Sequence, residues 1–260
     1  QGKALQAGTS HFLGQNFSKA FDVQFATSEG KKEFVWGTSW GVSTRLVGAL
    51  IMTHSDDKGL VLPPNLAPIQ VVLIPIFNSE EEFKLVSEKI TYVGEKLKSK
   101  NISIKIDDRK NHKPGWKFSE YELKGIPVRI VLGPKDLENN TVEVARRDEL
   151  SKEIIDVNQV DNIVPKLLKE IQINLFDKAK EFRKENTYHV KDYNEFKEII
   201  KNKGGFIYAH WDGSKETENL IKKETKATIR CIPMGYETNP GKCIITGKKS
   251  KGLVVFGKSY

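Results

Sequence analysis

The residues best placed for chemistry lie between positions 38 and 52. The turn-rich residues 38–44, which include Gly41, lead to Arg45, and an apolar run follows at residues 46–52. An arginine fixed at the head of a helix can hold its guanidinium against a phosphate. The apolar run predicts a buried helix that would fix Arg45 in this way. We therefore predict an anion site, with a surface ion pair as the alternative.

A second group of residues has the composition of an RNA-binding surface. Basic residues surround aromatic ones in this segment: Arg109, Lys110, Lys113, Lys117 and Lys124 lie around Trp116, Phe118 and Tyr121. Basic side chains bind phosphates, and aromatic rings stack on unstacked loop bases. Packing of Trp116 and Phe118 in the core is the alternative interpretation of these aromatic residues.

Hydrophobic periodicity predicts the elements that must position these residues. Strands are expected at 69–76, 102–106, 127–132, 141–145, 205–210, 227–233 and 253–257. Helices are expected at 45–53, from a cap at Asn78 through Leu97, and at 115–125, 160–184, 193–202 and 217–225. Strands that alternate with helices predict a largely wound α/β domain in the middle of the chain.

Composition and charge narrow the class of protein. The 260 residues are 38% apolar and 29% charged, which is ordinary for a soluble chain long enough for two or three units. The 42 Lys and Arg against 34 Asp and Glu give a net charge of +8, which suits a polyanionic partner. Two cysteines argue against a disulfide framework and indicate a reducing cytosol. No apolar run approaches the roughly 20 residues of a membrane span.

Two segments carry a family resemblance. Residues 39–64, SWGVSTRLVGALIMTHSDDKGLVLPP, closely resemble motif 3 of class II aminoacyl-tRNA synthetases, in the form found in prolyl-tRNA synthetases of the archaeal and eukaryotic type. Residues 6–18, QAGTSHFLGQNFS, resemble the segment that lines the adenylate pocket of that family. Within class IIa, the tripeptide at 9–11 and an extra C-terminal region favour the proline enzyme over the Thr, His and Gly enzymes.

The resemblance implies roles for individual residues near the start of the chain. The implied ATP-contacting residues are Gln6, Thr9, Ser43 and Arg45, of which Arg45 is the catalytic one. The implied proline-binding residues are His11, Trp40 and Gly41, which would select a small apolar ring by shape. His54, Asp56, Asp57 and Lys58 are expected to be mainly structural.

The middle of the chain resembles a tRNA-binding domain. Residues 115–135, with LKGIP at 123–127, are similar to the anticodon-binding domain shared by the Pro, Thr, His and Gly enzymes. The implied tRNA-binding residues are Arg109, Lys117, Glu120 and Lys124. Proline anticodons share two guanines, whose O6 and N7 atoms suit Lys or Arg. Glu120 or Glu122 would accept from the guanine amino group.

The expected fold class is α/β, in three parts. These are the end of a class II antiparallel-sheet catalytic domain at 1–66, an α/β anticodon-binding domain at 67–158, and a linker helix with a small α+β domain at 159–260. Many relatives bind zinc in the last part through four cysteines. Here Asp212 and Thr217 stand at the positions of the first pair, and the second pair keeps Cys243 but has Ile245 and Thr246 where its partner should be. Structural zinc needs nearly all its ligands as thiolate or imidazole, so we predict no metal and expect hydrogen bonds or an apolar core instead.

The resemblance covers almost all of the chain and implies a proline–tRNA ligase. Such an enzyme activates proline with ATP and Mg2+ to prolyl-adenylate and transfers the prolyl group to tRNA(Pro), as a cytoplasmic homodimer. Nothing here resembles motifs 1 and 2, and the chain opens at Gln1 as if inside an element. We therefore expect the C-terminal portion of a longer enzyme, inactive in isolation. The alternative is a non-catalytic tRNA-binding module or synthetase paralogue, against which Arg45 and His11 argue.

Overall fold

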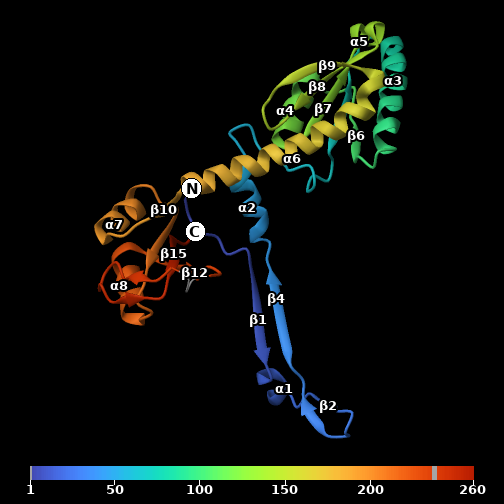
Figure 1. Cartoon of the computed structure of the whole chain (residues 1–260). Helices are drawn as coiled ribbons and strands as arrows, with labels where there is room; N and C mark the ends of the chain where they lie inside the picture. The colour runs from blue at the N-terminus through green and yellow to red at the C-terminus, as the bar shows by residue number, and fades with distance from the viewer. Residues whose placement is uncertain (1, 236–238) are drawn as a thin grey trace. The chain divides into compact units, whose positions relative to one another are not determined.

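A computed structural model describes residues 2–235 and 239–260 (Figure 1). The contacts divide the chain into two units, Leu50–Lys184 and a second unit made of Gln1–Ala49 with Glu185–Tyr260. Both units combine helices with strands, which confirms the expected α/β class. Residues 50–66 pack with the middle of the chain rather than with the residues before them.

A five-stranded mixed sheet forms the centre of Leu50–Lys184, in the order β6-β5-β7-β8-β9. Its strands are β5 (Val71–Pro75), β6 (Ile104–Ile106), β7 (Val128–Leu132), β8 (Thr141–Arg146) and β9 (Lys152–Asp156). β5 pairs in parallel with β6 and β7, whereas β8 and β9 continue the sheet antiparallel. The parallel arrangement expected of a wound α/β domain therefore holds only for β5, β6 and β7. β9 is a strand that periodicity misses, because its isoleucines lie among charged residues.

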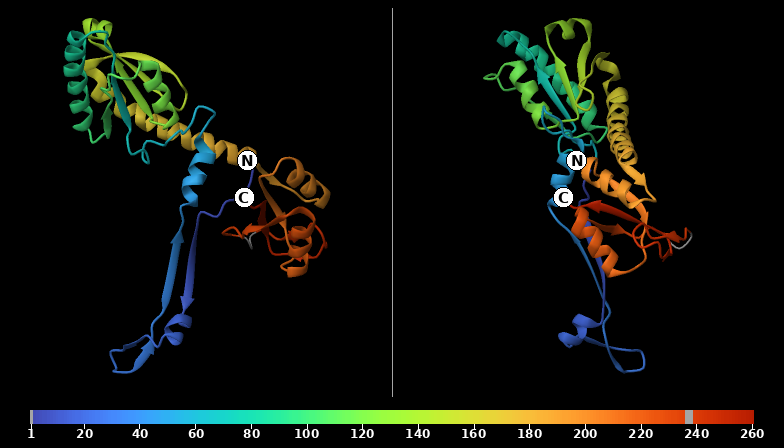
Figure 2. Two further views of the ribbon diagram at one scale, coloured as in Figure 1. Left: turned by 180° about the vertical axis from the view of Figure 1, so that it is seen from behind. Right: turned by 90° about the vertical axis from the view of Figure 1, so that its left-hand side faces the viewer.

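Two long helices cover one face of this sheet (Figure 1). They are α3 (Glu80–Lys98) and α6 (Val160–Glu185), whereas α4 (Pro114–Leu123) packs on the other face, the near side when the sheet is seen from behind in Figure 2. The short helices η1 (Val157–Gln159) and α5 (Pro134–Asn139) complete the unit. Ser79 rather than Asn78 caps α3, because its hydroxyl accepts from the backbone N–H of Glu82.

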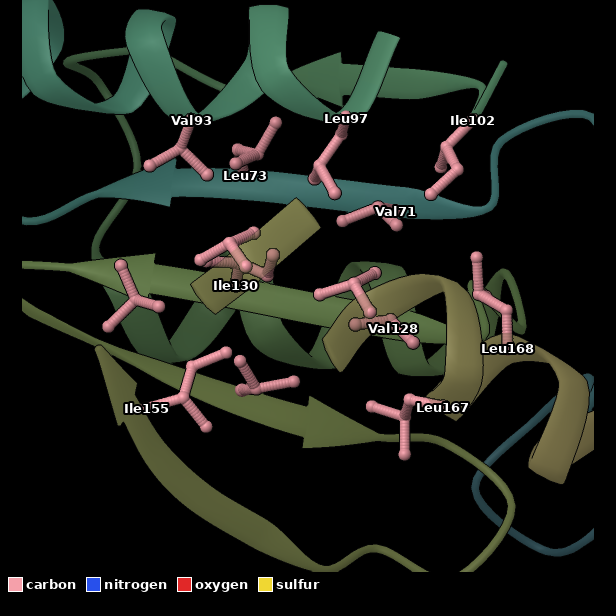
Figure 3. Close-up of a cluster of buried hydrophobic side chains, with 14 of the residues drawn as sticks. Val71, Leu73, Val93, Leu97, Ile102, Val128, Ile130, Ile155, Leu167 and Leu168 are labelled. Atoms are coloured by element: carbon pink, nitrogen blue, oxygen red, sulfur yellow. The ribbon is translucent and has the colours of Figure 1, made fainter. Parts of the chain in front are cut away.

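The core lies between the sheet and the two long helices (Figure 3). Val93 and Leu97 of α3 meet Leu73 of β5, and Leu167 and Leu168 of α6 lie against the same face of the sheet. Burial of each such side chain stabilises the fold by about 1.5–3 kcal/mol. This packing fixes the sheet and leaves its opposite face to α4 and to the hollow described below.

The second unit begins with a two-stranded antiparallel ribbon of β1 (Gly8–Gly14) and β4 (Gly37–Val42). Between these strands lie α1 (Asn16–Ala20) and the hairpin of β2 (Gln24–Ala26) and β3 (Lys32–Phe34). Helix α2 (Arg45–His54) follows the ribbon and has no buried residue. The prediction of a buried helix is therefore wrong on burial and right on helicity. The apolar run encodes the helix, but burial needs a packing partner that this run does not specify.

The C-terminal part of the second unit is a small α+β structure. Its sheet has the order β10-β11-β15-β12, with strands β10 (Thr187–His189), β11 (Phe206–His210), β12 (Ala227–Cys231) and β15 (Leu253–Lys258). The remaining elements are α7 (Tyr193–Asn202), α8 (Lys215–Thr225) and the hairpin of β13 (Gly241–Lys242) and β14 (Lys249–Ser250). Phe196 and Phe256 meet edge to face in its core, with centroids 5.3 Å apart. Within the described ranges, no helix is long and apolar enough to cross a membrane.

Candidate RNA-binding site and nucleotide-binding ribbon

The β1–β4 ribbon brings several of the expected nucleotide-contacting residues together. Thr9 pairs with Gly41 and His11 pairs with Ser39. Paired residues share a face and side chains alternate along a strand, so Thr9 and His11 lie on the face that Gly41 leaves bare. A Cβ on Gly41 would stand 3.1 Å from Thr9 Oγ1. A side chain at position 41 would therefore crowd Thr9, and the glycine lets the Thr9 side chain lie close to the backbone of β4.

Trp40 lies on the other side of the ribbon. It pairs with Ser10, one position away from the Thr9–Gly41 pair, and it is 80% exposed. Because a shift of one residue along a strand reverses the face, Trp40 and Gly41 do not share one pocket wall. The expectation that they line the proline pocket together does not agree with this register.

Arg45 begins α2 beside the end of the ribbon. Its Nη1 donates to Gln6 Oε1 at 3.3 Å, and its backbone N–H donates to Ser43 Oγ at 3.4 Å. In the part of the chain that the structure describes, Arg45 forms no ion pair. The surface ion pair that is its alternative role is therefore not made, and its charge is available to an anion.

The expected tRNA-binding cluster is an ion-pair network around a buried carboxylate. Arg109 donates through Nε and Nη2 to the two oxygens of Asp107, at 2.8 and 2.7 Å, and also pairs with Glu120. Glu120 in turn accepts from Lys124. Three of the four expected residues, Arg109, Glu120 and Lys124, therefore lie together and compensate one another.

Lys117 occupies a different position from the other three. Its side chain is 2% exposed, and its Nζ donates to the backbone oxygen of Asp107 at 2.9 Å. The ammonium cannot reach an RNA on the surface without leaving this buried partner. The structure therefore does not support Lys117 as an RNA contact, and its role is to hold Asp107 in place.

An open hollow lies on the sheet face beside α4. Glu122 and Arg129 line it, together with Arg147, Leu150 and Lys152. Arg129 is 6% exposed, and its Nη1 donates to Glu122 Oε1 at 3.2 Å. Its guanidinium carbon lies 4.0 Å from the centre of the Phe118 ring. A buried arginine and a carboxylate thus meet at one hollow, and the arginine also lies over an aromatic ring.

Arg129 has a hydrogen-bond donor without a partner in the described part of the chain. Its Nε is buried and has no hydrogen-bond partner among the described residues. An unpaired buried donor costs about 1–3 kcal/mol, so a ligand or a water molecule that accepts from it is favoured. Arginine donors beside a carboxylate acceptor complement the edge of guanine, which presents acceptors at O6 and N7 and a donor at its amino group.

Sequence reasoning named Glu122 only as an alternative and missed Arg129. The signal was available in the strand at 127–132, PVRIVL, where one charged residue interrupts a run of apolar ones. A charge in a buried strand needs a partner and is often functional. The other half of the site could not be found in this way, because α4 and β7 meet only in the fold.

A cluster of hydrogen bonds centred on Asp212 joins two loops of the C-terminal part. Asp212 Oδ2 accepts from Thr217 Oγ1 at 3.0 Å and from Thr246 Oγ1 at 2.9 Å, while Oδ1 accepts from Ser214 Oγ at 2.8 Å. Burial works to raise the pKa of Asp212, but the hydrogen bonds from these hydroxyls lower it below its usual range. Three hydroxyls thus satisfy the carboxylate.

The side chains around this hydrogen-bond cluster are not a suitable ligand set for zinc. Cys243 is buried and Cys231 is exposed, and both are free thiols. Across residues 2–235 and 239–260, no group of three or more His, Cys, Asp or Glu side chains could hold a metal ion. One carboxylate with hydroxyl neighbours lacks the thiolate or imidazole ligands that structural zinc requires.

Acidification should destabilise the Leu50–Lys184 unit. The hydrogen bond from Arg147 lowers the pKa of Asp56 to about 2. Burial works to raise the pKa of Asp107, but Arg109 and Lys117 hold that pKa well below its usual range. A carboxyl with a depressed folded-state pKa stabilises the fold above its unfolded pKa of about 3.9, and this contribution is lost as the pH falls. Urea unfolding between pH 7 and pH 2 should show the loss begin below about pH 5. An Asp56→Asn chain should show a shallower decline, and an equal decline in both chains would contradict this assignment.

Two family models match the chain. Residues 70–167 match the anticodon binding domain, and residues 193–260 match the domain described as prolyl-tRNA synthetase, C-terminal. The hollow lined by Glu122 and Arg129 lies within the first match. The fold and the matches together define the class as an aminoacyl-tRNA synthetase region that contains an anticodon-binding domain.

Curated relatives narrow this class to one family. The chain is 60% identical over 259 residues to a proline–tRNA ligase of Porphyromonas gingivalis, covering 100% of this chain and 52% of that protein. It is 61% identical to the ligase of Parabacteroides distasonis and 59% identical to that of Christiangramia forsetii, covering 100% of this chain and 52% and 53% of those proteins. The chain thus spans about half the length of the curated relatives it matches. It belongs to the prolyl-tRNA synthetase family, as a C-terminal portion.

Proposed function

We propose that the chain supplies the anticodon-binding part, and one side of the adenylate site, of a proline–tRNA ligase. The complete enzyme would activate proline with ATP and Mg2+ and transfer the prolyl group to tRNA(Pro), as a cytoplasmic homodimer. The observation that carries this proposal is the Glu122–Arg129 pair at an open hollow of the anticodon-binding domain. The names of the curated relatives support the reaction.

The hollow is the proposed site for an anticodon guanine. The Arg129 guanidinium would donate to O6 or N7, and the Glu122 carboxylate would accept from the amino group. Phe118 lies against the guanidinium and keeps its plane fixed. The cations of the Arg109–Glu120–Lys124 cluster would contact backbone phosphates and give affinity without base identity.

The ribbon and the start of α2 are the proposed side of the adenylate site. Arg45 would bind the ATP phosphates, with Gln6 and Ser43 holding its orientation and Thr9 contacting the nucleotide. His11 would donate to the proline carbonyl over the bare backbone at Gly41, and Trp40 would contribute from the opposite face. Mg2+ would accompany ATP as part of the substrate.

A non-catalytic RNA-binding module is the second candidate. It is favoured by the exposure of α2 and of the ribbon, whose side chains are not enclosed by other described elements. The two candidates share the RNA site and differ in whether the adenylate site is ever completed.

Proline-dependent exchange between ATP and pyrophosphate distinguishes these two candidates. The polypeptide at the length of its relatives should catalyse the exchange, and an Arg45→Ala version should lose it by at least about 100-fold, as expected when a charge-stabilising group is removed. An Arg45→Lys version keeps the positive charge but lacks the paired donors of the planar guanidinium, so it should recover only part of the rate. Tight tRNA binding without any exchange would favour the non-catalytic module.

A further inference from the structure

Arg147 joins segments of Leu50–Lys184 that are far apart in sequence. Its Nη1 and Nη2 donate to the two carboxylate oxygens of Asp56, at 2.7 and 2.5 Å, and Nη2 also contacts the Gly59 carbonyl at 3.3 Å. Its Nε donates to the backbone carbonyl of Glu122 at 3.0 Å. The residue is 4% exposed. Every guanidinium nitrogen is engaged, so Arg147 is a fixed and buried clamp.

The residues that Arg147 holds form a strap, residues 55–62, which continues directly from α2. The backbone N–H of Leu60 donates to Leu123 O at 3.0 Å, and that of Leu62 donates to Gly125 O at 3.3 Å. Gly59 has a φ of +131°, and a Cβ there would stand 2.5 Å from Leu123 Cα. The strap therefore lies directly on the end of α4, closer than any side chain at position 59 would allow.

Glu122 connects this clamp with the proposed RNA site. Its carbonyl accepts from Arg147, while its carboxylate accepts from Arg129 at the hollow. Both Glu122 and Arg147 line the hollow. A ligand that fixes Glu122 also fixes the acceptor that Arg147 uses.

We propose that Arg147 is a positioning residue that couples RNA binding at the hollow to docking of the strap, and so to the end of α2. The coupling rests on the proposed function, because RNA is the ligand it requires. RNA bound to Glu122 and Arg129 holds the end of α4 in the form that accepts the strap. By thermodynamic reciprocity, a docked strap raises the affinity for RNA by the same factor. The strap is continuous with α2, and α2 begins at Arg45. The clamp therefore links the anticodon-binding site through the chain to the proposed ATP-binding residue.

Hydrogen exchange on the 260-residue chain tests this coupling. The probe is a short RNA hairpin whose loop carries two adjacent guanines, and the amides observed are Gly59, Leu60 and Leu62. Asp56→Asn weakens the clamp, and Gly59→Ala lifts the strap without touching the hollow. Asp57→Asn is the matched control, because it removes the same charge from an adjacent exposed carboxylate.

In the wild-type chain and in the Asp57→Asn control, saturating RNA should slow exchange at the strap. In the Asp56→Asn and Gly59→Ala chains this slowing should be lost, and RNA should bind about fivefold more weakly than to the control, the lower end of typical coupling. RNA binding that leaves wild-type strap exchange unchanged overturns the coupling alone, as does full slowing in both strap variants. Failure of the wild-type chain to bind RNA overturns the proposed function, and the coupling with it.

Discussion

Replacing Asp107 by alanine should destabilise the Leu50–Lys184 unit by about 3–5 kcal/mol, the cost of breaking a buried ion pair. Asp107 is 2% exposed and accepts from Arg109, with Lys117 Nζ 3.5 Å from its Oδ1. Without the carboxylate, Lys117 Nζ is left in the interior with only a backbone carbonyl as a partner. The free energy of unfolding in urea measures this loss.

Two further chains make the Asp107 prediction specific. Asp108→Ala removes the adjacent exposed carboxylate and should change stability by less than about 0.5 kcal/mol. A chain with Asp107→Leu and Lys117→Met removes both buried charges and should recover much of the loss, since apolar pairs of similar volume replace buried ion pairs well. Equal losses in the Asp107→Ala and Asp108→Ala chains would show that the buried pair has no special role.

Replacing Arg129 by alanine should weaken binding of a guanine-containing loop RNA by about 10- to 100-fold. Arg129 supplies the only buried unpaired guanidinium donor among the described residues, and its side chain lines the hollow and lies over the ring of Phe118. Titration of the 260-residue chain with a fluorescent hairpin, at one fixed salt concentration, measures the change.

Lys84→Ala is the control for the Arg129 variant. Lys84 is exposed on α3, which covers the opposite face of the sheet, and its loss removes one positive charge. That variant should bind all loop sequences slightly and equally more weakly, as expected for general electrostatics. Arg129→Lys should rescue overall affinity only in part, because lysine lacks the planar fork. The guanine assignment is wrong if Arg129→Ala and Lys84→Ala behave alike.

The elements of this fold could be predicted where one residue pattern decides the structure. The β-branched run at 69–76 gives β5, and the spacing of Val86, Ile90, Val93 and Leu97 gives α3. β9 could not be found, because pairing with β8 rather than composition makes Lys152–Asp156 a strand. The expectation that α2 is buried was wrong for a related reason. An apolar run favours burial, but it does not determine which element will pack against it.

The candidate site could be predicted only to the level of its segment. Arg109, Glu120 and Lys124 do lie together, but Lys117 between them turns inward to Asp107. Position along α4 decides this, and only the fold reveals which helix face meets Asp107. Glu122 and Arg129 become neighbours because α4 packs beside β7. Trp40 and Gly41 lie on opposite faces of the ribbon because adjacent residues of a strand point to opposite sides.

Discrimination between loop sequences tests the central claim most directly. The measurement is the dissociation constant of the 260-residue chain for a tRNA transcript with a proline anticodon, against the same transcript with its two anticodon guanines replaced by adenines. A site that reads guanine through Glu122 and Arg129 should bind the altered transcript at least about tenfold more weakly, since one mismatched base typically costs 1–3 kcal/mol. Equal affinity for the two transcripts would contradict the account, because the chain would then bind RNA through charge alone.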